Sequence, residues 1–329
     1  MALLVTVLKW AAAAAAVVWG GLALLDWIGP TEPADLTARF DAAKLGDDLD
    51  LWLAEQEAQV PNLRDNAAKM IVWAGEPGER TDLALVYLHG FSATREELRP
   101  LPDLVAAGVG ANLYFARLTG HGQDGAALGE ARVADWMADV AEAMAIGRRL
   151  GDRVILMGNS TGSTLAIAVA ADPALRTDLA GVILMSPNLG VSGLPGRALE
   201  WPYVRTWGPM LIGPERSFTP RNDGHAKNWT TSYPSKVLAA LGALTHEVRG
   251  LDFSSMIVPA IFFVSNEDQV VDPKKSRQVA GTWGAPSDLV PVVITPADDP
   301  GGHILAGDIL SPKKTAPVSE RILFWARGL

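Results

Sequence analysis

Short apolar runs recur along most of the chain and indicate a buried β-sheet. They do not alternate between apolar and polar residues, and several are rich in β-branched side chains. Strands that are buried on both faces have this pattern, and they occur in parallel sheets whose strands are joined by crossover helices. The strands predicted in this way cover residues 83–88, 112–118, 154–157, 182–185, 260–264 and 290–294.

Helical patterns lie between and after these runs. Residues 134–150 carry an apolar stripe at helical spacing, and residues 160–171 and 319–325 are also expected to be helical. Residues 69–73 predict one further strand, which ends at a turn rich in glycine and proline. The fold class that follows is α/β, with a mostly parallel central sheet and flanking helices.

The N-terminal segment differs from the rest, because Lys9 is its only charge between residues 2 and 25. The stretch from residue 2 to residue 25 is close to the length that a helix needs to cross a bilayer. We therefore expect residues 1–29 to be an uncleaved membrane anchor. A bacterial-type inner membrane, with the protein facing the periplasm, is the expected location. A cleaved secretory signal, with residues 21–23 near the cleavage site, and an alanine-rich helix packed on the core are the alternatives. The charges on either side, Lys9 against Arg39 and Lys44, leave the orientation open.

Residues 30–68 predict a linker followed by an amphipathic helix. Prolines open this segment, and apolar residues from Leu36 to Leu53 recur at near-helical spacing. Acidic residues cluster at positions 47–50, but acids on one face of such a helix are usually solvated, so we assign them no metal.

Composition narrows the function further. The net charge is −9 over 329 residues, which argues against nucleic acid as a partner and favours a small neutral one. The sequence contains no cysteine, which excludes disulfides, thiolate catalysis and cysteine-based zinc sites. We expect no metal and no cofactor, and composition leaves the oligomeric state open.

Residues 158–162, of sequence Gly-Asn-Ser-Thr-Gly, lie between a predicted strand and a predicted helix. This order indicates a nucleophile elbow, a sharp turn that presents Ser160 as an exposed hydroxyl. Gly158 and Gly162 would allow strand and helix to approach closely. The backbone N–H of Thr161, at the start of the helix, is aimed to stabilise an oxyanion. The motif alone is a loose pattern, and its strand and helix context gives it weight.

A serine nucleophile needs a base, which is normally an imidazole held by a carboxylate. In hydrolases with this elbow the chain order is serine, acid, histidine, and only His303 lies beyond the last two predicted strands. The acid is expected after the strand at 260–264, where Asp268 is the leading candidate. Its rivals are Glu267, Asp272, Asp298 and Asp299.

The second oxyanion donor is expected in the loop after the strand at 83–88. The N–H of Phe91 is our choice, and His89 and Gly90 are expected to support this loop. His121, which borders the same region, is interpreted as structural. His225 and His246 are assigned no role.

Residues 188–253 break the rhythm of strands and helices. They are rich in proline and tryptophan, and no strand alternation is visible. Such an insertion between two strands predicts a cap over the carboxyl ends of the sheet, where ligands bind in α/β folds.

Together these motifs resemble the α/β-hydrolase superfamily, and within it the carboxylesterase, monoacylglycerol lipase and lysophospholipase-like group. The resemblance covers roughly residues 80–329, with the core at 69–187 and 254–329. It implies hydrolysis of an apolar acyl ester through an acyl-enzyme, and a cap between strands six and seven.

The same motifs are compatible with other functions. A serine peptidase of the proline-aminopeptidase type would need clustered acids in the cap, and the five acids there are scattered. An acyltransferase would share every motif. A catalytically silent, membrane-tethered binding module is disfavoured by the intact Ser160, Asp268 and His303.

Overall fold

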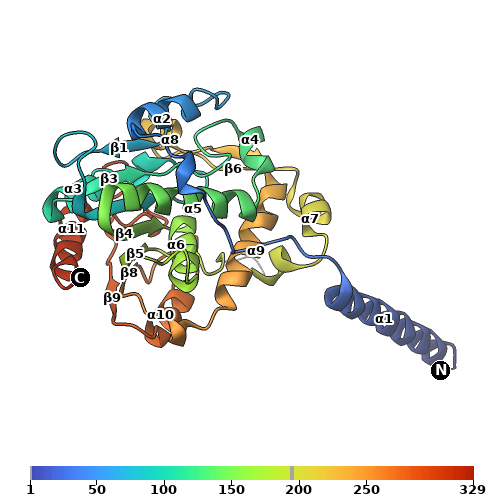
Figure 1. Cartoon of the computed structure of the whole chain (residues 1–329). Helices are drawn as coiled ribbons and strands as arrows, with labels where there is room; N and C mark the ends of the chain where they lie inside the picture. Colours follow the sequence, from blue (N-terminus) through green and yellow to red (C-terminus); the bar gives the residue numbers. More distant parts are fainter. Residues whose placement is uncertain (1, 193–195) are drawn as a thin grey trace.

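A seven-stranded sheet organises the protein in the computed structural model, which describes residues 2–192 and 196–329 (Figure 1). The strand order is β1-β3-β2-β4-β5-β8-β9. Only β1 is antiparallel to its neighbour; every other pair in this sheet is parallel, which confirms the predicted fold class. The strands are β1 (Met70–Val72), β2 (Thr81–Leu88), β3 (Asn112–Phe115), β4 (Gly151–Asn159), β5 (Leu179–Met185), β8 (Ala260–Val264) and β9 (Ser287–Pro291).

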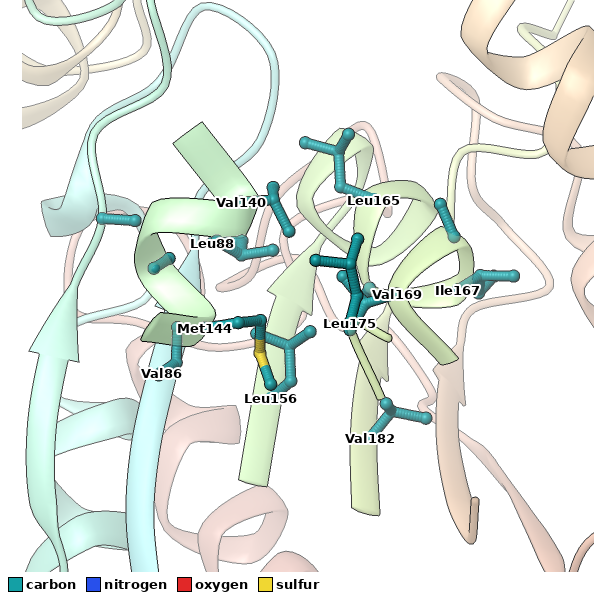
Figure 2. Packing of buried hydrophobic residues seen from close by; sticks show 14 of the residues in the cluster. Val86, Leu88, Val140, Met144, Leu156, Leu165, Ile167, Val169, Leu175 and Val182 are labelled. Carbon is teal, nitrogen blue, oxygen red and sulfur yellow. The ribbon is translucent and has the colours of Figure 1, made fainter. Parts of the chain in front are cut away.

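Both faces of the sheet are covered, which is why its strands are apolar without alternation. In β2, Val86 and Leu88 belong to one buried cluster and Leu85 and Tyr87 to the cluster on the other face. Figure 2 shows side chains of α5 and α6 packed against β2, β4 and β5 in the first cluster. The helices of the core are α3 (Leu101–Val109), α4 (Gly125–Glu130), α5 (Val133–Leu150), α6 (Thr161–Ala171), α10 (Pro273–Thr282) and α11 (Pro312–Ala326).

The predicted cap is an insertion between β5 and β8. It contains η3 (Gly196–Glu200), α7 (Val204–Ile212), β6 (Glu215–Ser217), α8 (Asp223–Asn228), β7 (Ser232–Pro234) and α9 (Leu238–Arg249). Residues 193–195 of this region lie outside the described residues. Contrary to the sequence prediction, the insertion does hold strands, because β6 and β7 form a short antiparallel pair that stands apart from the main sheet. It follows the fifth strand of that sheet in chain order.

The N-terminal helix α1 (Ala2–Ile28) projects from the body of the protein (Figure 1). Its residues 4–28 are long and apolar enough to cross a membrane, and none of that span is buried in the protein. The helix ends immediately before Gly29 and Pro30, as expected from the loss of a backbone donor at proline.

The amphipathic helix predicted after the linker begins later than the series of apolar residues from Leu36 suggests. Residues 30–41 have no regular secondary structure, and the helix α2 (Leu49–Glu57) begins only where Asp48 accepts a hydrogen bond from the Leu51 N–H. Leu36 and Phe40 nevertheless pack against the core. The first apolar residues of the series therefore belong to an irregular segment that packs on the core, and only the last ones, from Leu49 on, are helical.

The boundaries of the last strand and of the last helix also differ from the prediction. The last strand covers Ser287–Pro291 rather than residues 290–294, because β9 is an edge strand whose position is set by pairing with β8 alone. Val293, within the predicted strand, is 72% exposed. The C-terminal helix α11 begins at Pro312, seven residues before the predicted start at Ser319, and it accommodates Pro317 within its first turns.

The exposed position of α1 generates a prediction. Deletion of residues 1–28 removes no buried side chain of the span and leaves Gly29, Pro30 and Glu32 in place. We expect the truncated protein to be soluble and to retain its turnover of a small ester. Differential centrifugation and kinetics of the purified truncated and full-length forms measure this. A truncated form that is inactive, or that has lost its native circular dichroism spectrum, would mean that α1 is part of the folded body.

Candidate active site

Ser160 lies at the sharp turn between β4 and α6. Its backbone has φ +50° and ψ −112°, a region that non-glycine residues rarely adopt. A Cβ at Gly158 would lie 2.4 Å from the backbone of Gly162, and a Cβ at Gly162 would lie 2.0 Å from the Leu88 carbonyl oxygen. The two glycines are thus required by close backbone contacts, which hold the strained turn in place.

His303 and Asp268 meet on neighbouring loops. The His303 Nδ1 lies 2.8 Å from Asp268 Oδ2, and both side chains are almost fully buried. The other carboxylate oxygen of Asp268 accepts the N–H groups of Val270 and Val271, at 2.8 and 2.9 Å. The two loops are joined by a hydrogen bond from the Gln269 N–H to the Gly301 carbonyl oxygen. In this arrangement Nδ1 of the imidazole carries a proton and donates a hydrogen bond to the carboxylate. Nε2 is therefore unprotonated and can accept a proton.

The rival acids have other partners. Asp272 accepts the Lys274 N–H at the start of α10, and Asp298 accepts hydrogen bonds from Thr295. Asp299 accepts the N–H groups of Gly301, His303 and Ile304, so it shapes the histidine loop without touching the imidazole. Glu267 is exposed.

The carboxylates near His303 change the pKa of its imidazole. Burial alone would lower the pKa of His303, but the charge of Asp268 and its hydrogen bond raise that pKa above the usual 6.5, with smaller contributions from Asp299 and Glu97. An imidazole with a carboxylate behind it is suited to accept a proton and to be stabilised as imidazolium.

Two backbone N–H groups are free beside Ser160. In the described part of the chain, neither the Phe91 N–H nor the Thr161 N–H has a hydrogen-bond acceptor. Thr161 is the first residue of α6, where N–H groups have no intrahelical partner. Phe91 follows Gly90, where a Cβ would lie 3.3 Å from the Ser160 Cβ, so the loop passes directly against the elbow.

His89 and His121 support this loop. His89 is buried; its Nε2 accepts the Leu118 N–H at 3.1 Å, and its Nδ1 lies 2.9 Å from the Gly90 carbonyl oxygen. Nδ1 therefore carries the proton. Burial lowers the pKa of His89 to about 4 and places that of His121 well below 6.5. Both rings are neutral at pH 7, 4.9 Å apart, and His121 also contacts the ring of Phe91.

Sequence analysis missed Glu97, which lies beneath the same loop. Its side chain accepts hydrogen bonds from the Tyr87 hydroxyl, at 2.7 Å, and from the Gly90 N–H. Only 1% of Glu97 is exposed, and burial raises its pKa to about 7 in spite of these hydrogen bonds. In the sequence it stands in an ordinary polar run after Arg95 and Glu96, so no local signal marks it.

Ser160, Phe91 and His303 line one cavity of about 470 Å³. The insertion forms much of its wall, mainly with apolar side chains. His225 also lines the cavity, whereas His246 is paired with Glu200 outside it. The apolar lining residues are Phe91, Val191, Leu199, Phe218, Trp229, Tyr233, Leu238, Leu241, Val270, Val271, Ile304 and Leu310.

The sequence matches the alpha/beta hydrolase family over residues 85–317. It is also 25% identical, over 199 residues, to a thermostable monoacylglycerol lipase from Bacillus sp. strain H-257; this match covers 59% of the chain and 74% of the relative.

Solved structures share the fold. A structure from a study of the metagenome-derived lipolytic enzymes LipS and LipT superposes with a TM-score of 0.66 at 20% identity, over 81% of this chain and all of that one. The monoglyceride lipase of Saccharomyces cerevisiae gives a TM-score of 0.58 at 13% identity, over 81% and 95% of the two chains.

The chain belongs to the alpha/beta hydrolase family. It is a lipase- or esterase-type member of that family, a carboxylic ester hydrolase.

Glu97 gives a pH-dependent prediction. An unfolded glutamate ionises near 4.5 and the folded one near 7, so the native state binds more protons between these values and the free energy of unfolding falls as pH rises through that window. Glu97→Gln removes this fall, which can reach about 3 kcal/mol. Urea unfolding of both proteins from pH 4.5 to 8 measures it. Glu55→Gln, on the exposed face of α2, is the control. Parallel curves for wild type and Glu97→Gln would contradict the assignment.

Proposed function

We propose that the protein hydrolyses carboxylic esters of apolar acyl groups through an acyl-enzyme, with Ser160 as nucleophile, His303 as base and Asp268 as orienting acid. The observation that carries the proposal is the hydrogen bond between His303 and Asp268 at the wall of the cavity that also contains Ser160. The strained backbone of Ser160 supports it.

The chemistry follows from these positions. The Ser160 Oγ attacks the ester carbonyl carbon while its proton passes to His303 Nε2, and Asp268 stabilises the imidazolium that forms. The N–H groups of Phe91 and Thr161 donate to the tetrahedral oxyanion. The imidazolium then protonates the departing alcohol, and the acyl group stays on Ser160. A water molecule then loses a proton to the same imidazole and attacks the acyl carbon; the imidazolium returns that proton to the Ser160 Oγ as the bond to the acyl group breaks and the carboxylic acid leaves.

The walls of the cavity favour an apolar acyl chain. Half of the residues that line it are aliphatic or aromatic, and its volume of about 470 Å³ suits a ligand of modest size. We infer that a small monoester, such as a monoacylglycerol, is the substrate class. The name of the Bacillus relative agrees with this choice.

Glu200 bears on the peptidase alternative. A substrate amine would need a free carboxylate, and Glu200 is already paired with Arg249 and His246. The acyltransferase alternative shares the acyl-enzyme and differs only in the acceptor that resolves it.

The α1 helix supports attachment to a membrane. We propose that residues 1–29 are an uncleaved anchor in a bacterial inner membrane, with the hydrolase on the periplasmic side. A cleaved secretory signal is the alternative. Residues 69–187 and 254–329 form the catalytic core in this proposal, and residues 188–253 form the cap.

A substrate profile tests the proposed reaction. The purified protein is assayed with p-nitrophenyl esters of graded chain length, a monoacylglycerol and an amide analogue. Ester turnover without amide turnover supports the proposal; glycerol added as an acceptor reveals acyl transfer if new esters form. Faster cleavage of the amide than of the esters would overturn it.

Removal of the nucleophile or the base should abolish turnover. We expect Ser160→Ala and His303→Ala each to reduce kcat/KM by about 10⁴-fold or more, because members of a triad act as a unit. Kinetics with a short p-nitrophenyl ester measure the loss, and circular dichroism checks the fold. Ser255→Ala, at an exposed serine that does not line the cavity, is the serine control. Activity near wild type in either variant would displace that residue from its role.

Asp268→Asn should cost about 10³-fold or more in kcat/KM, because the imidazole loses its orienting charge. The pKa of His303 should fall, since burial then acts without Asp268. The acidic limb of the pH profile of kcat/KM therefore moves to lower pH. Asp272→Asn is the matched control and should be nearly neutral for activity. A greater loss in Asp272→Asn than in Asp268→Asn would show that the acid is misassigned.

A further inference from the structure

The cap carries exposed apolar side chains that do not line the catalytic cavity. Met210 and Leu211, at the end of α7, are 78% and 76% exposed, and Trp201 and Tyr203, just before α7, are about half exposed. We call these four residues the cap apolar patch. Large apolar side chains gathered on one surface of a water-soluble domain usually mark a site of interaction.

The cap apolar patch lies beside the C-terminal end of α1. A groove between them is lined by Trp19, Leu22 and Leu25 from α1, and by Trp201, Met210 and Leu211 from the cap. Its lining is almost entirely apolar. The candidate membrane span ends at Ile28, so the patch is at the level where that span would leave a bilayer.

The chain after α1 is fastened to the cap at this point. The Tyr203 N–H donates a hydrogen bond to the Pro30 carbonyl oxygen at 3.0 Å. A Cβ at Gly29 would lie 2.5 Å from the Pro202 Cβ, so the backbone here is packed on the cap. The connection to α1 is therefore short and held, not a free tether.

Glu32 strengthens this attachment. Its side chain is 6% exposed and pairs with Arg205 of α7 at 2.5 Å and with Arg132, at the start of α5, at 2.9 Å. Burial alone would raise the pKa of Glu32, but the hydrogen bonds from both arginines lower it. One carboxylate thus joins the segment after α1 to the cap and to the core.

The patch and the wall of the catalytic cavity share one segment of the cap. Leu199, in η3, lines that cavity, and Trp201 two residues later belongs to the patch. The segment of the cap that forms part of the cavity wall thus continues directly into the patch.

We propose that the cap apolar patch is a second membrane-binding element, which α1 and its fastened connection hold in the interface of the same bilayer, so that the cavity receives its substrate from the lipid phase. This inference rests on the proposed function for the identity of the substrate. Tryptophan and tyrosine are the side chains favoured at the interface between lipid and water. Met210 and Leu211 would enter the acyl region.

Depth measurements test the location of the patch without any assay of activity. Because the chain has no cysteine, Leu211→Cys and the control Val293→Cys each introduce a single site for a nitroxide label. The two side chains are similarly exposed, at 76% and 72%, and Val293 lies after β9, outside the cap. The full-length labelled proteins are reconstituted in phosphatidylcholine vesicles, and collisions with oxygen and with a water-soluble nickel chelate are compared.

We expect the label at position 211 to collide mainly with oxygen, which concentrates in the bilayer, and the label at 293 mainly with nickel. Equal access of nickel at both positions would place the patch in water and overturn the proposal. Protection of position 211 from both reagents would show that protein, such as a second copy of the chain, covers it, and would also overturn the proposal.

An activity experiment tests the consequence. In the full-length protein, Met210→Ser with Leu211→Ser should lower hydrolysis of a monoacylglycerol embedded in vesicles at least about tenfold, with unchanged kcat/KM on a water-soluble short ester. Ile257→Ser with Val293→Ser is the control pair, at 67% and 72% exposure. Equal losses in both pairs, or no loss, would overturn delivery from the lipid phase. Absence of short-ester turnover in the wild type would overturn the proposed function and leave the depth result standing.

Discussion

The close packing of the elbow between β4 and α6 against the end of β2 determines the geometry of the whole site. The missing Cβ of Gly162 would lie 2.0 Å from the Leu88 carbonyl oxygen and 2.8 Å from that of His89. The start of α6 is therefore packed against the end of β2, whose continuation is the loop containing Phe91. One contact sets both the strained turn of Ser160 and the position of the loop that faces it, because neither can move without opening the other.

The second half of the site depends on neighbouring loops at the same end of the sheet. β8 and β9 are adjacent and parallel, so the loops after them, with Asp268 and His303, start from one edge. Hydrogen bonds within and between these loops hold the carboxylate and the imidazole in contact. Asp299 contributes through three backbone N–H groups rather than through the ring, which explains why an acid so close to His303 in sequence is not its partner.

The parts of the structure that sequence could predict are those with local causes. The elbow was predictable because its glycines, its serine and its flanking strand and helix lie within a few residues, and His303 followed from chain order. The position of β9 was not, because an edge strand takes its register from β8. The role of Glu97 was not predictable either, since its burial depends on packing beneath a loop that begins at His89. The attachment of Glu32 to Arg205 joins residues 173 positions apart, which no local pattern indicates.

The assignment of the nucleophile is tested most directly by trapping the covalent intermediate. A fluorophosphonate reacts fastest with a serine that is activated by a base and faces an oxyanion site. Peptide mass spectrometry of the labelled full-length protein should place one adduct per chain on Ser160, and prior blocking of the enzyme should prevent ester turnover in proportion to labelling. An adduct on another serine, or an unlabelled protein that still hydrolyses esters, would contradict the account.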